Sequence, residues 1–296
     1  MKEALEEYPG ETRWDESLAP YTSLKVGGRA DALVFPGSVE MLMELMKGIS
    51  KAGVPYFVLG NGTNVLVKEG GIRGLVLNLK NLNRIELIGF DVIFAEAGSA
   101  YPKVATFAME HHLGGIEYAA GIPGTVGGAV AMNAGIPNCD TGSSLLNIGL
   151  VDEAGTLRDL SPQEIDFGYR STSLPQGVVV SAAFRLTPTP EEEVEASLKA
   201  YLKTRRTRQP LDLSNCGSVF KNPPDGFAGD LIEQAGLKGC RVGDAQVSTK
   251  HGNFIVNLGS ARADDVLALI EKMHEAIVAR FGISLELEVK VVGSDK

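Results

Sequence analysis

The chain has 296 residues, of which 44% are hydrophobic and 22% charged, a composition typical of a soluble globular enzyme with more than one domain. Its formal net charge of −9 would repel a polyphosphate backbone, so we expect no nucleic-acid partner. The first nine residues show no secretory signal, and no window is long and apolar enough to span a bilayer. We therefore predict a cytoplasmic protein without membrane insertion.

Cysteines and histidines give no sign of a disulfide framework or a metal centre. Cys139, Cys216 and Cys240 lack CxxC spacing, and the four histidines form no HExxH arrangement. This pattern predicts free thiols and no metal site.

Residues 32–79 carry the pattern of a small strand–helix–strand unit. An apolar run at 32–36 precedes Ser38, a candidate N-cap, and apolar residues then recur at helical spacing from 42 to 49. Further apolar runs at 54–59 and 74–79 predict two more strands. We predict a first subdomain over residues 1–79.

A second α+β subdomain is predicted over residues 80–189. Two β-prone runs around Gly89, within 84–98, indicate a hairpin, and apolar spacing over 104–113 predicts a helix. Strands follow at 148–152 and 178–186 before Pro188 and Pro190 interrupt the chain.

Residues 190–296 are predicted to form a C-terminal domain. A helix begins at the acidic residues 191–193 and ends in a basic cluster at 203–206, the charge order that the helix dipole favours. A second helix is expected over 266–281. Apolar and polar residues then alternate from 283 to 291, which predicts a half-buried strand with Glu286 and Glu288 on one polar face.

Two glycine-rich loops are candidate phosphate cradles, because glycine lets backbone N–H groups approach an anion closely. Their residues are Gly60, Asn61, Gly62, Thr63 and Asn64 in the first loop, and Gly121, Pro123, Gly124, Thr125, Gly127 and Gly128 in the second. Neither loop has the Rossmann or P-loop spacing. Each alone could be a tight turn. The two together indicate a dinucleotide, without choosing which one.

Six short segments carry a family resemblance. In chain order they are TSLKVGG (22–28), GNGTN (60–64), GIPGTVGG (121–128), GYR (168–170), GSVFKNP (217–223) and LELEV (285–289). Together they resemble the UDP-N-acetylenolpyruvoylglucosamine reductase family of peptidoglycan precursor synthesis, and GSVFKNP with the upstream YR and downstream ExEV is the specific part. Arg170 and Ser218 lie 48 positions apart (218 minus 170), which is similar to the shorter, type II subgroup.

The resemblance implies an α+β fold in which a two-part FAD-binding domain of the vanillyl-alcohol-oxidase (PCMH) type, residues 1–79 and 80–189, precedes a substrate-binding domain, residues 190–296. It also implies non-covalent FAD, with NADPH as co-substrate, and reduction of the enolpyruvyl group of UDP-N-acetylglucosamine enolpyruvate to UDP-N-acetylmuramate. The first glycine loop has no histidine, the residue that relatives with covalent FAD often use there. We expect a monomer.

The same resemblance assigns the chemistry to three residues. Arg170 would stabilise negative charge on the substrate and its carboxylate, Ser218 would donate a proton, and Glu288 would orient the substrate or assist proton movement. Glu286 competes with Glu288, because periodicity alone does not separate them. The predicted substrate contacts are Tyr169, Lys221, Asn222 and Lys250.

Two alternatives explain the glycine loops without these roles. A flavin oxidase of related fold would use the loops but not the ordered set of Arg170, Ser218 and Glu288. A non-catalytic nucleotide-binding module would need the loops alone. One departure from the family is local: after Asn133-Ala134-Gly135 the chain lacks the AYG-type continuation common in relatives.

Overall fold

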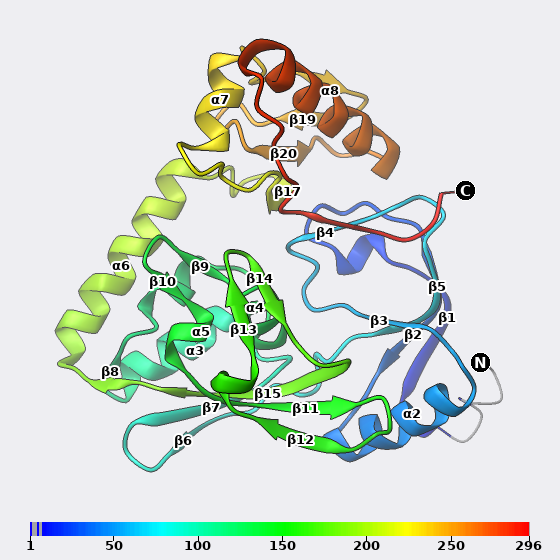
Figure 1. Cartoon of the computed structure of the whole chain (residues 1–296), viewed down its shortest axis with the longest axis vertical. Helices are drawn as coiled ribbons and strands as arrows, with labels where there is room; N and C mark the ends of the chain where they lie inside the picture. The colour runs from blue at the N-terminus through cyan, green and yellow to red at the C-terminus, as the bar shows by residue number, and fades with distance from the viewer. Residues whose placement is uncertain (2–4, 6–7, 296) are drawn as a thin grey trace. The chain divides into compact units, whose positions relative to one another are not determined.

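The computed structural model describes Met1, Leu5 and residues 8–295 (Figure 1). This part of the chain forms two compact units, each with its own hydrophobic core. Unit 1 consists of Met1–Trp14, Ala32–Gly60 and Gly74–Thr204, and unit 2 of Asp15–Asp31, Asn61–Arg73 and Arg205–Lys296. Within the described residues, no helix is long and apolar enough to cross a membrane.

An antiparallel five-stranded sheet of order β12-β11-β15-β7-β6 organises unit 1. Its strands are β6 (Ile85–Ile88), β7 (Val92–Glu96), β11 (Leu145–Asp152), β12 (Leu157–Leu160) and β15 (Gly177–Arg185). Three helices, α3 (Tyr101–Glu110), α4 (Val126–Ala131) and α5 (Thr141–Ser144), lie over one face (Figure 1). The predicted hairpin around Gly89 is confirmed, with Ile88 opposite Val92.

Smaller elements complete unit 1. They are β3 (Tyr56–Val58), β8 (Leu113–Gly114), β9 (Gly135–Ile136), β10 (Cys139–Asp140), β13 (Asp166–Gly168), β14 (Ser171–Ser173), β16 (Thr187–Pro188), the helix α2 (Val39–Lys51) and the 3-10 helices η2 (Glu117–Gly121) and η3 (Pro162–Glu164). The predicted helix after Ser38 is α2, and the Ser38 hydroxyl accepts a hydrogen bond from Met41 N, 3.3 Å away.

A sheet of order β1-β2-β5-β3 includes the strand–helix–strand unit expected from the sequence. Its first three strands are β1 (Glu11–Ser17), β2 (Arg29–Phe35) and β5 (Ile72–Leu77). Strands β3 and β5 are parallel. The helix α2 connects β2 to β3, and β5 lies between these two strands in the sheet. The division between the units falls within β1, β2 and β5.

Fully buried hydroxyl groups connect the helices of unit 1. The Tyr101 hydroxyl lies 3.2 Å from that of Tyr118 and 3.1 Å from that of Thr141. Burial raises the pKa of Tyr101 well above its ordinary value, so the phenol stays neutral. These bonds join α3, η2 and α5 in a satisfied buried network, which favours one fixed arrangement.

Unit 2 contains an antiparallel sheet of order β17-β20-β19-β18. Its elements are the 3-10 helix η1 (Ala19–Tyr21), β4 (Val65–Val67), β17 (Ser214–Ser218), α7 (Ala228–Gln234), β18 (Arg241–Val242), β19 (Ala245–Val247), β20 (Phe254–Asn257), α8 (Ala263–Phe281) and β21 (Lys290–Val292). The helix predicted over 266–281 is α8. Its apolar residues from Val266 to Ile277 form a buried stripe, and Gly282 ends the helix in the left-handed region.

The strand predicted over residues 283–291 is wrong for most of its length. Leu287 forms an isolated bridge with Phe220, and only β21 is a regular strand, parallel to β4. Alternation fails because Leu287 is 37% exposed instead of buried, while Leu285 and Val289 are buried. The hydrogen-bond partner of the backbone changes at this point: Glu288 N donates to the carbonyl of residue 219, whereas Lys290 N donates to Asn64 O.

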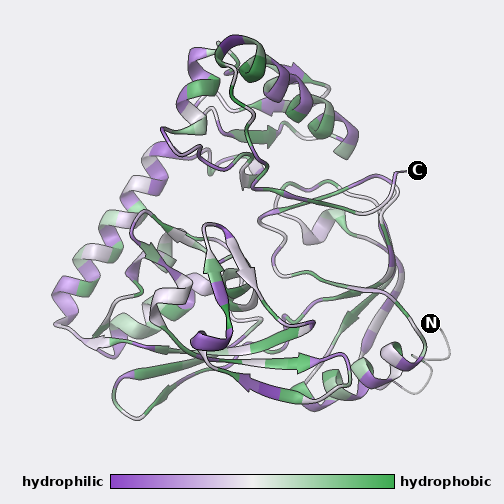
Figure 2. Cartoon of the chain, in the orientation of Figure 1, coloured by the Kyte–Doolittle hydropathy of each residue, from purple (hydrophilic) through white to green (hydrophobic). Residues whose placement is uncertain are grey.

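The helix α6 (Glu191–Arg208) is polar along most of its length, as Figure 2 shows. Only Val194 and Leu198 are buried. Its first turn is acidic and its last turn basic, which confirms the predicted charge order. The division between the units falls within α6, and the three-part division at residues 79 and 189 stays a prediction.

Leu269 and Val278 on α8 provide a matched test of the unit 2 core. Leu269 is fully buried and Val278 is 40% exposed. We expect Leu269→Ala to lower the free energy of unfolding by about 2–5 kcal/mol, because it leaves a cavity. Val278→Ala should change it by less than about 0.5 kcal/mol. Denaturant titration followed by circular dichroism measures both, and equal effects would contradict the assigned core.

Candidate functional site

The first and second glycine loops touch within unit 1. A Cβ atom added at Gly60 would lie 2.7 Å from the Thr125 hydroxyl oxygen, so only glycine allows this approach. Asn78 Nδ2 donates to the Gly60 carbonyl at 3.2 Å and fixes the start of the first loop. The two segments that the sequence singled out separately, Gly60 and Thr125, are therefore neighbours.

The second loop uses part of its backbone for folding. The N–H groups of Val126 and Gly127 donate to carbonyls at 99 and 97, and Gly128 N donates to the Thr125 hydroxyl, which caps α4. Within the described chain, the N–H groups of Gly124 and Thr125 have no such partner. We expect an anion to bind those two amides rather than the amides of α4.

The remainder of the first loop belongs to unit 2. Gly62 has a positive φ of 61°, and an added Cβ would lie 2.5 Å from Tyr21 O and 2.7 Å from Thr22 Cα. The N–H groups of Asn61 and Gly62 have no hydrogen-bond partner among the described residues. Open amides beside a position that excludes side chains fit a phosphate cradle.

Arg170 lies in unit 1, in the two-residue loop that joins β13 to β14. Its backbone is left-handed, with φ 55°, which is uncommon for a residue with a side chain. The guanidinium carbon lies 5.0 Å from the centre of the exposed Tyr169 ring. The predicted catalytic arginine and substrate-binding tyrosine are thus side by side at the tip of a hairpin.

Ser218 ends β17 in unit 2, directly after an irregularity in its pairing with β20. Gly217 there has φ 78°, and such bulges redirect the side chain that follows. The half-buried Ser218 hydroxyl has no hydrogen-bond partner within the described chain. Nearby, burial raises the pKa of the Cys216 thiol to about 12, so Cys216 stays neutral and inert.

The structure separates Glu286 from Glu288. The Glu286 side chain is 73% exposed and forms an ion pair with Lys221 at 2.6 Å. The half-buried Glu288 is held through its backbone: its N–H donates to Val219 O at 2.9 Å, and Asn64 Nδ2 donates to its carbonyl at 3.0 Å. Glu288 therefore has a fixed backbone position beside the residue that follows Ser218.

Asn222 and Lys250, predicted substrate contacts, both have structural hydrogen bonds in unit 2. Asn222 Oδ1 accepts from Ala228 N at 3.1 Å, at the first residue of α7. Lys250 Nζ donates to Arg206 O at 2.6 Å, in the last turn of α6. Such bonds satisfy helix termini, so each residue has a role in folding that needs no substrate.

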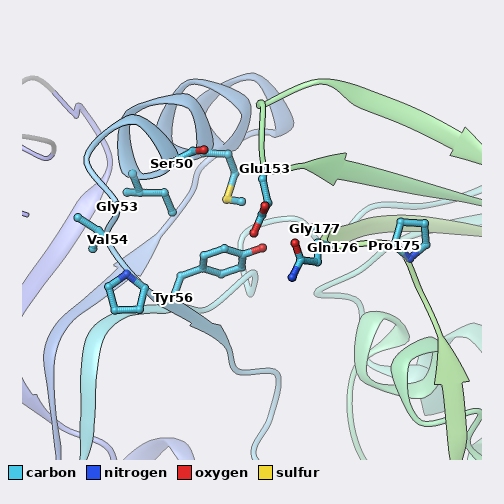
Figure 3. Close-up of a pocket in the computed structure, with 11 residues that line it drawn as sticks. Ser50, Gly53, Val54, Tyr56, Glu153, Pro175, Gln176 and Gly177 are labelled. Atoms are coloured by element: carbon cyan, nitrogen blue, oxygen red, sulfur yellow. The ribbon is translucent and has the colours of Figure 1, made fainter.

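A cavity of about 630 Å³ lies in unit 1 beside the end of α2 (Figure 3). The Tyr56 hydroxyl and the Glu153 carboxylate point toward each other there. Burial, and then the charge of Glu153, raises the pKa of Tyr56. No predicted site residue lines this cavity. Among the described residues, no group of three His, Cys, Asp or Glu side chains could hold a metal ion.

Gly62 and Gly53 provide a matched test of the first loop, because both have φ 61° and only Gly62 is crowded. Gly53→Ala should cost about 1–2 kcal/mol for the left-handed backbone alone. We expect Gly62→Ala to cost more than about 2 kcal/mol and to release bound flavin, because its Cβ would collide with backbone. Thermal unfolding and the ratio of flavin to protein absorbance measure this. Equal effects of the two variants would contradict a tightly packed loop.

Comparisons with known proteins agree along the chain. Residues 209–292 match the family model described as "UDP-N-acetylenolpyruvoylglucosamine reductase, C-terminal domain", and residues 30–161 match "FAD binding domain". These matches and the mixed helix and strand content confirm an α+β fold with an FAD-binding domain and a C-terminal reductase domain.

Individual relatives match over nearly their whole length. The chain is 41% identical to the UDP-N-acetylenolpyruvoylglucosamine reductase of Geobacillus kaustophilus, over 95% of this chain and 93% of the relative, and 44% identical to that of Rubrobacter xylanophilus, over 95% of each. The crystal structure of UDP-N-acetylenolpyruvylglucosamine reductase from Thermus caldophilus is 36% identical, with a TM-score of 0.83, and covers 96% of this chain and 99% of that one. The chain belongs to the UDP-N-acetylenolpyruvoylglucosamine reductase family.

Proposed function

We infer that the protein is an FAD-dependent reductase that uses NADPH to convert the enolpyruvyl group of UDP-N-acetylglucosamine enolpyruvate into the lactyl group of UDP-N-acetylmuramate, and we propose that Arg170, Ser218 and Glu288 act on that substrate. The observation that carries the proposal is the Ser218 hydroxyl. It follows a bulge, lacks a partner within the described chain, and lies next to the residue that holds the Glu288 backbone.

The glycine loops fit a dinucleotide cofactor. The open amides of Gly60, Asn61 and Gly62 in the first loop, and of Gly124 and Thr125 in the second, suit a diphosphate. FAD held there would supply the hydride chemistry that links NADPH to the terminal carbon of the enolpyruvyl group. We propose that all eleven predicted loop residues shape this cradle, with Gly127 and Gly128 doing so through packing and capping instead of direct contact.

Arg170 supplies positive charge where negative charge develops. Hydride addition leaves an electron pair on the carbon that bears the ether oxygen, delocalised into the adjacent carboxylate. A guanidinium can bind that carboxylate through two parallel hydrogen bonds. Arg170 starts from a short hairpin loop, and its guanidinium lies 5.0 Å from the centre of the Tyr169 ring. A charge that is already in place needs little reorganisation as the reaction proceeds.

Ser218 then donates a proton to that carbon, and the new C–H bond completes the reduction. Serine is a weak acid, so its proton moves only as the carbanion develops beside it. Glu288, with its backbone fixed beside Val219, can orient the substrate or return a proton to the serine oxygen. Glu286 is a weaker candidate because it is engaged with Lys221.

The remaining contacts are proposed for the sugar nucleotide. A diphosphate can replace Glu286 as the partner of the largely buried Lys221. Tyr169 offers a ring face, and Asn222 retains its Nδ2 donors. Lys250 Nζ donates to Arg206 O at the end of α6, so its positive charge would act on the sugar nucleotide from that position. We also propose that the protein works as a monomer in the cytoplasm, which agrees with its three free cysteines.

Arg170→Lys tests the carboxylate clamp. NADPH should bleach the yellow protein, and the enolpyruvyl sugar nucleotide should restore the colour. Because lysine keeps the charge but loses the fork, we expect reoxidation by substrate to slow roughly 10- to 100-fold, while bleaching by NADPH changes little. Anaerobic stopped-flow absorbance measures both half-reactions. Equal slowing of the two would indicate a role in folding or flavin binding.

Ser218→Ala tests the proton donor, with Ser214→Ala on the same strand as control. Loss of a general acid should slow reoxidation by substrate ~10²–10⁴-fold and leave NADPH oxidation nearly intact. Ser218→Cys should recover part of the rate, since a thiol still carries a transferable proton. Stopped-flow measurements in ordinary and heavy water report the step. An Ala variant that reoxidises at the wild-type rate would remove Ser218 from the mechanism.

A further inference from the structure

Asn133 is a buried polar residue in unit 1 that lies outside the groups assigned above. It is 3% exposed and follows α4, with a left-handed φ of 40° that asparagine tolerates better than most residues. Its amide makes three hydrogen bonds. Nδ2 donates to Asp140 Oδ2 at 3.0 Å and to Gly168 O at 3.1 Å, and Oδ1 accepts from Gly142 N at 2.9 Å.

One of these bonds reaches the hairpin that carries Arg170. Gly168 is the last residue of β13 and lies two positions before Arg170. A second bond holds the other strand: the Thr172 hydroxyl donates to Val130 O, in α4, at 2.6 Å. Both strands of the hairpin are thus bonded to α4 or to the residues directly after it, and Arg170 lies between the two bonds. In Figure 1 the hairpin rises beside α4.

The surroundings of Asn133 give it little freedom to move. Thr141 N and the Thr141 hydroxyl both donate to Ala134 O, and Thr141 also meets the buried Tyr101 hydroxyl at 3.1 Å. On the other side, a Cβ added at Gly142 would lie 2.8 Å from the Phe167 ring. The segment after α4 is therefore packed on both sides, and a fully hydrogen-bonded buried polar side chain makes such a segment rigid.

We propose that Asn133 is a positioning residue for the reaction: it fixes the β13–β14 hairpin to the end of α4, so that the arginine at the hairpin tip keeps one orientation relative to the second glycine loop at the start of the same helix. The inference rests on the proposed role of Arg170. An amide suits the task because it offers two donors and one acceptor at once, and its three partners use all of them. An aspartate would lose both donors and face Asp140 as a like charge.

Asn133→Gly is the main test variant, because glycine keeps the left-handed backbone without strain and removes only the amide. Asn138→Gly is the matched control: Asn138 has φ 69°, is exposed, and lies five positions away in the loop between β9 and β10. Asn133→Asp is a second variant, which keeps the oxygen that accepts from Gly142 N if the glycine variant folds poorly.

We expect Asn133→Gly and Asn133→Asp to slow reoxidation by the enolpyruvyl substrate about 10-fold and to change reduction by NADPH less than about twofold, because both variants lose the buried hydrogen bond to Gly168 O. Amide hydrogen exchange over residues 166–173 should accelerate at least 10-fold in both variants, with exchange in β11 and β15 unchanged. The Asn138→Gly control should match wild type in every measurement.

A double-mutant cycle with Arg170→Lys separates positioning from general stability. If Asn133 acts through Arg170, Asn133→Gly should cost less than about twofold once Arg170→Lys is present. Additive losses, equal losses in both half-reactions, or unchanged exchange in the hairpin would each overturn the proposal. A different result would contradict the proposed role of Arg170 itself. In that case Arg170→Lys alone would slow reduction by NADPH and reoxidation by substrate equally, in the presence of either Asn or Gly at position 133.

Discussion

A pair of hydrogen bonds at Asn64 holds together the part of the site that lies in unit 2. Its side chain donates to the carbonyl of Glu288, 224 positions along the chain, and its own carbonyl accepts from Lys290 N. Because Glu288 N also donates to Val219 O, the glutamate is bonded on one side to the first glycine loop and on the other to the strand that ends in Ser218. Loss of the Asn64 side-chain amide would remove the bond between the first glycine loop and Glu288, and would leave the backbone bonds of Glu288 to Val219 and of Lys290 to Asn64.

Polar side chains of the candidate site differ in whether they already form hydrogen bonds to backbone groups of the protein. Lys250 and Asn222 satisfy backbone groups at helix termini, whereas Ser218 has no partner among the described residues. The Ser218 hydroxyl oxygen is not among the fully buried side-chain atoms that lack a partner in the described chain, so it is accessible and can donate to or accept from a ligand. This contrast supports a direct role for Ser218, and both a structural and a substrate-binding role for Asn222 and Lys250.

Local signals made much of the fold predictable from the sequence. Ser38 before an apolar helical pattern marks the start of α2, and Gly89 between two β-prone runs marks the turn from β6 to β7, because each signal depends on residues within a few positions.

Contacts between distant residues could not be predicted in this way. The strand predicted over 283–291 was wrong because apolar and polar alternation does not show where the backbone changes from one hydrogen-bond partner to another. The proposed preference for Glu288 over Glu286 rests on the ion pair of Glu286 with Lys221, which lies 65 positions away in the sequence. The sequence around Asn133 does not predict its contact with the hairpin, because its hydrogen bond to Gly168 spans 35 positions.

The parallel pairing of β4 with β21 also constrains the order of events during synthesis. Val67 and Lys290 are 223 residues apart (290 minus 67), so at 5–20 residues per second β4 waits roughly 11–45 s for its partner to emerge from the ribosome. During that interval Leu66 and Val67, both fully buried in the finished structure, remain exposed as an unpaired strand edge. Unit 1 needs nothing beyond residue 204, so it can fold first on the ribosome. In nascent chains, residues 65–67 therefore form an apolar segment of the kind that chaperones bind, directly after the first glycine loop.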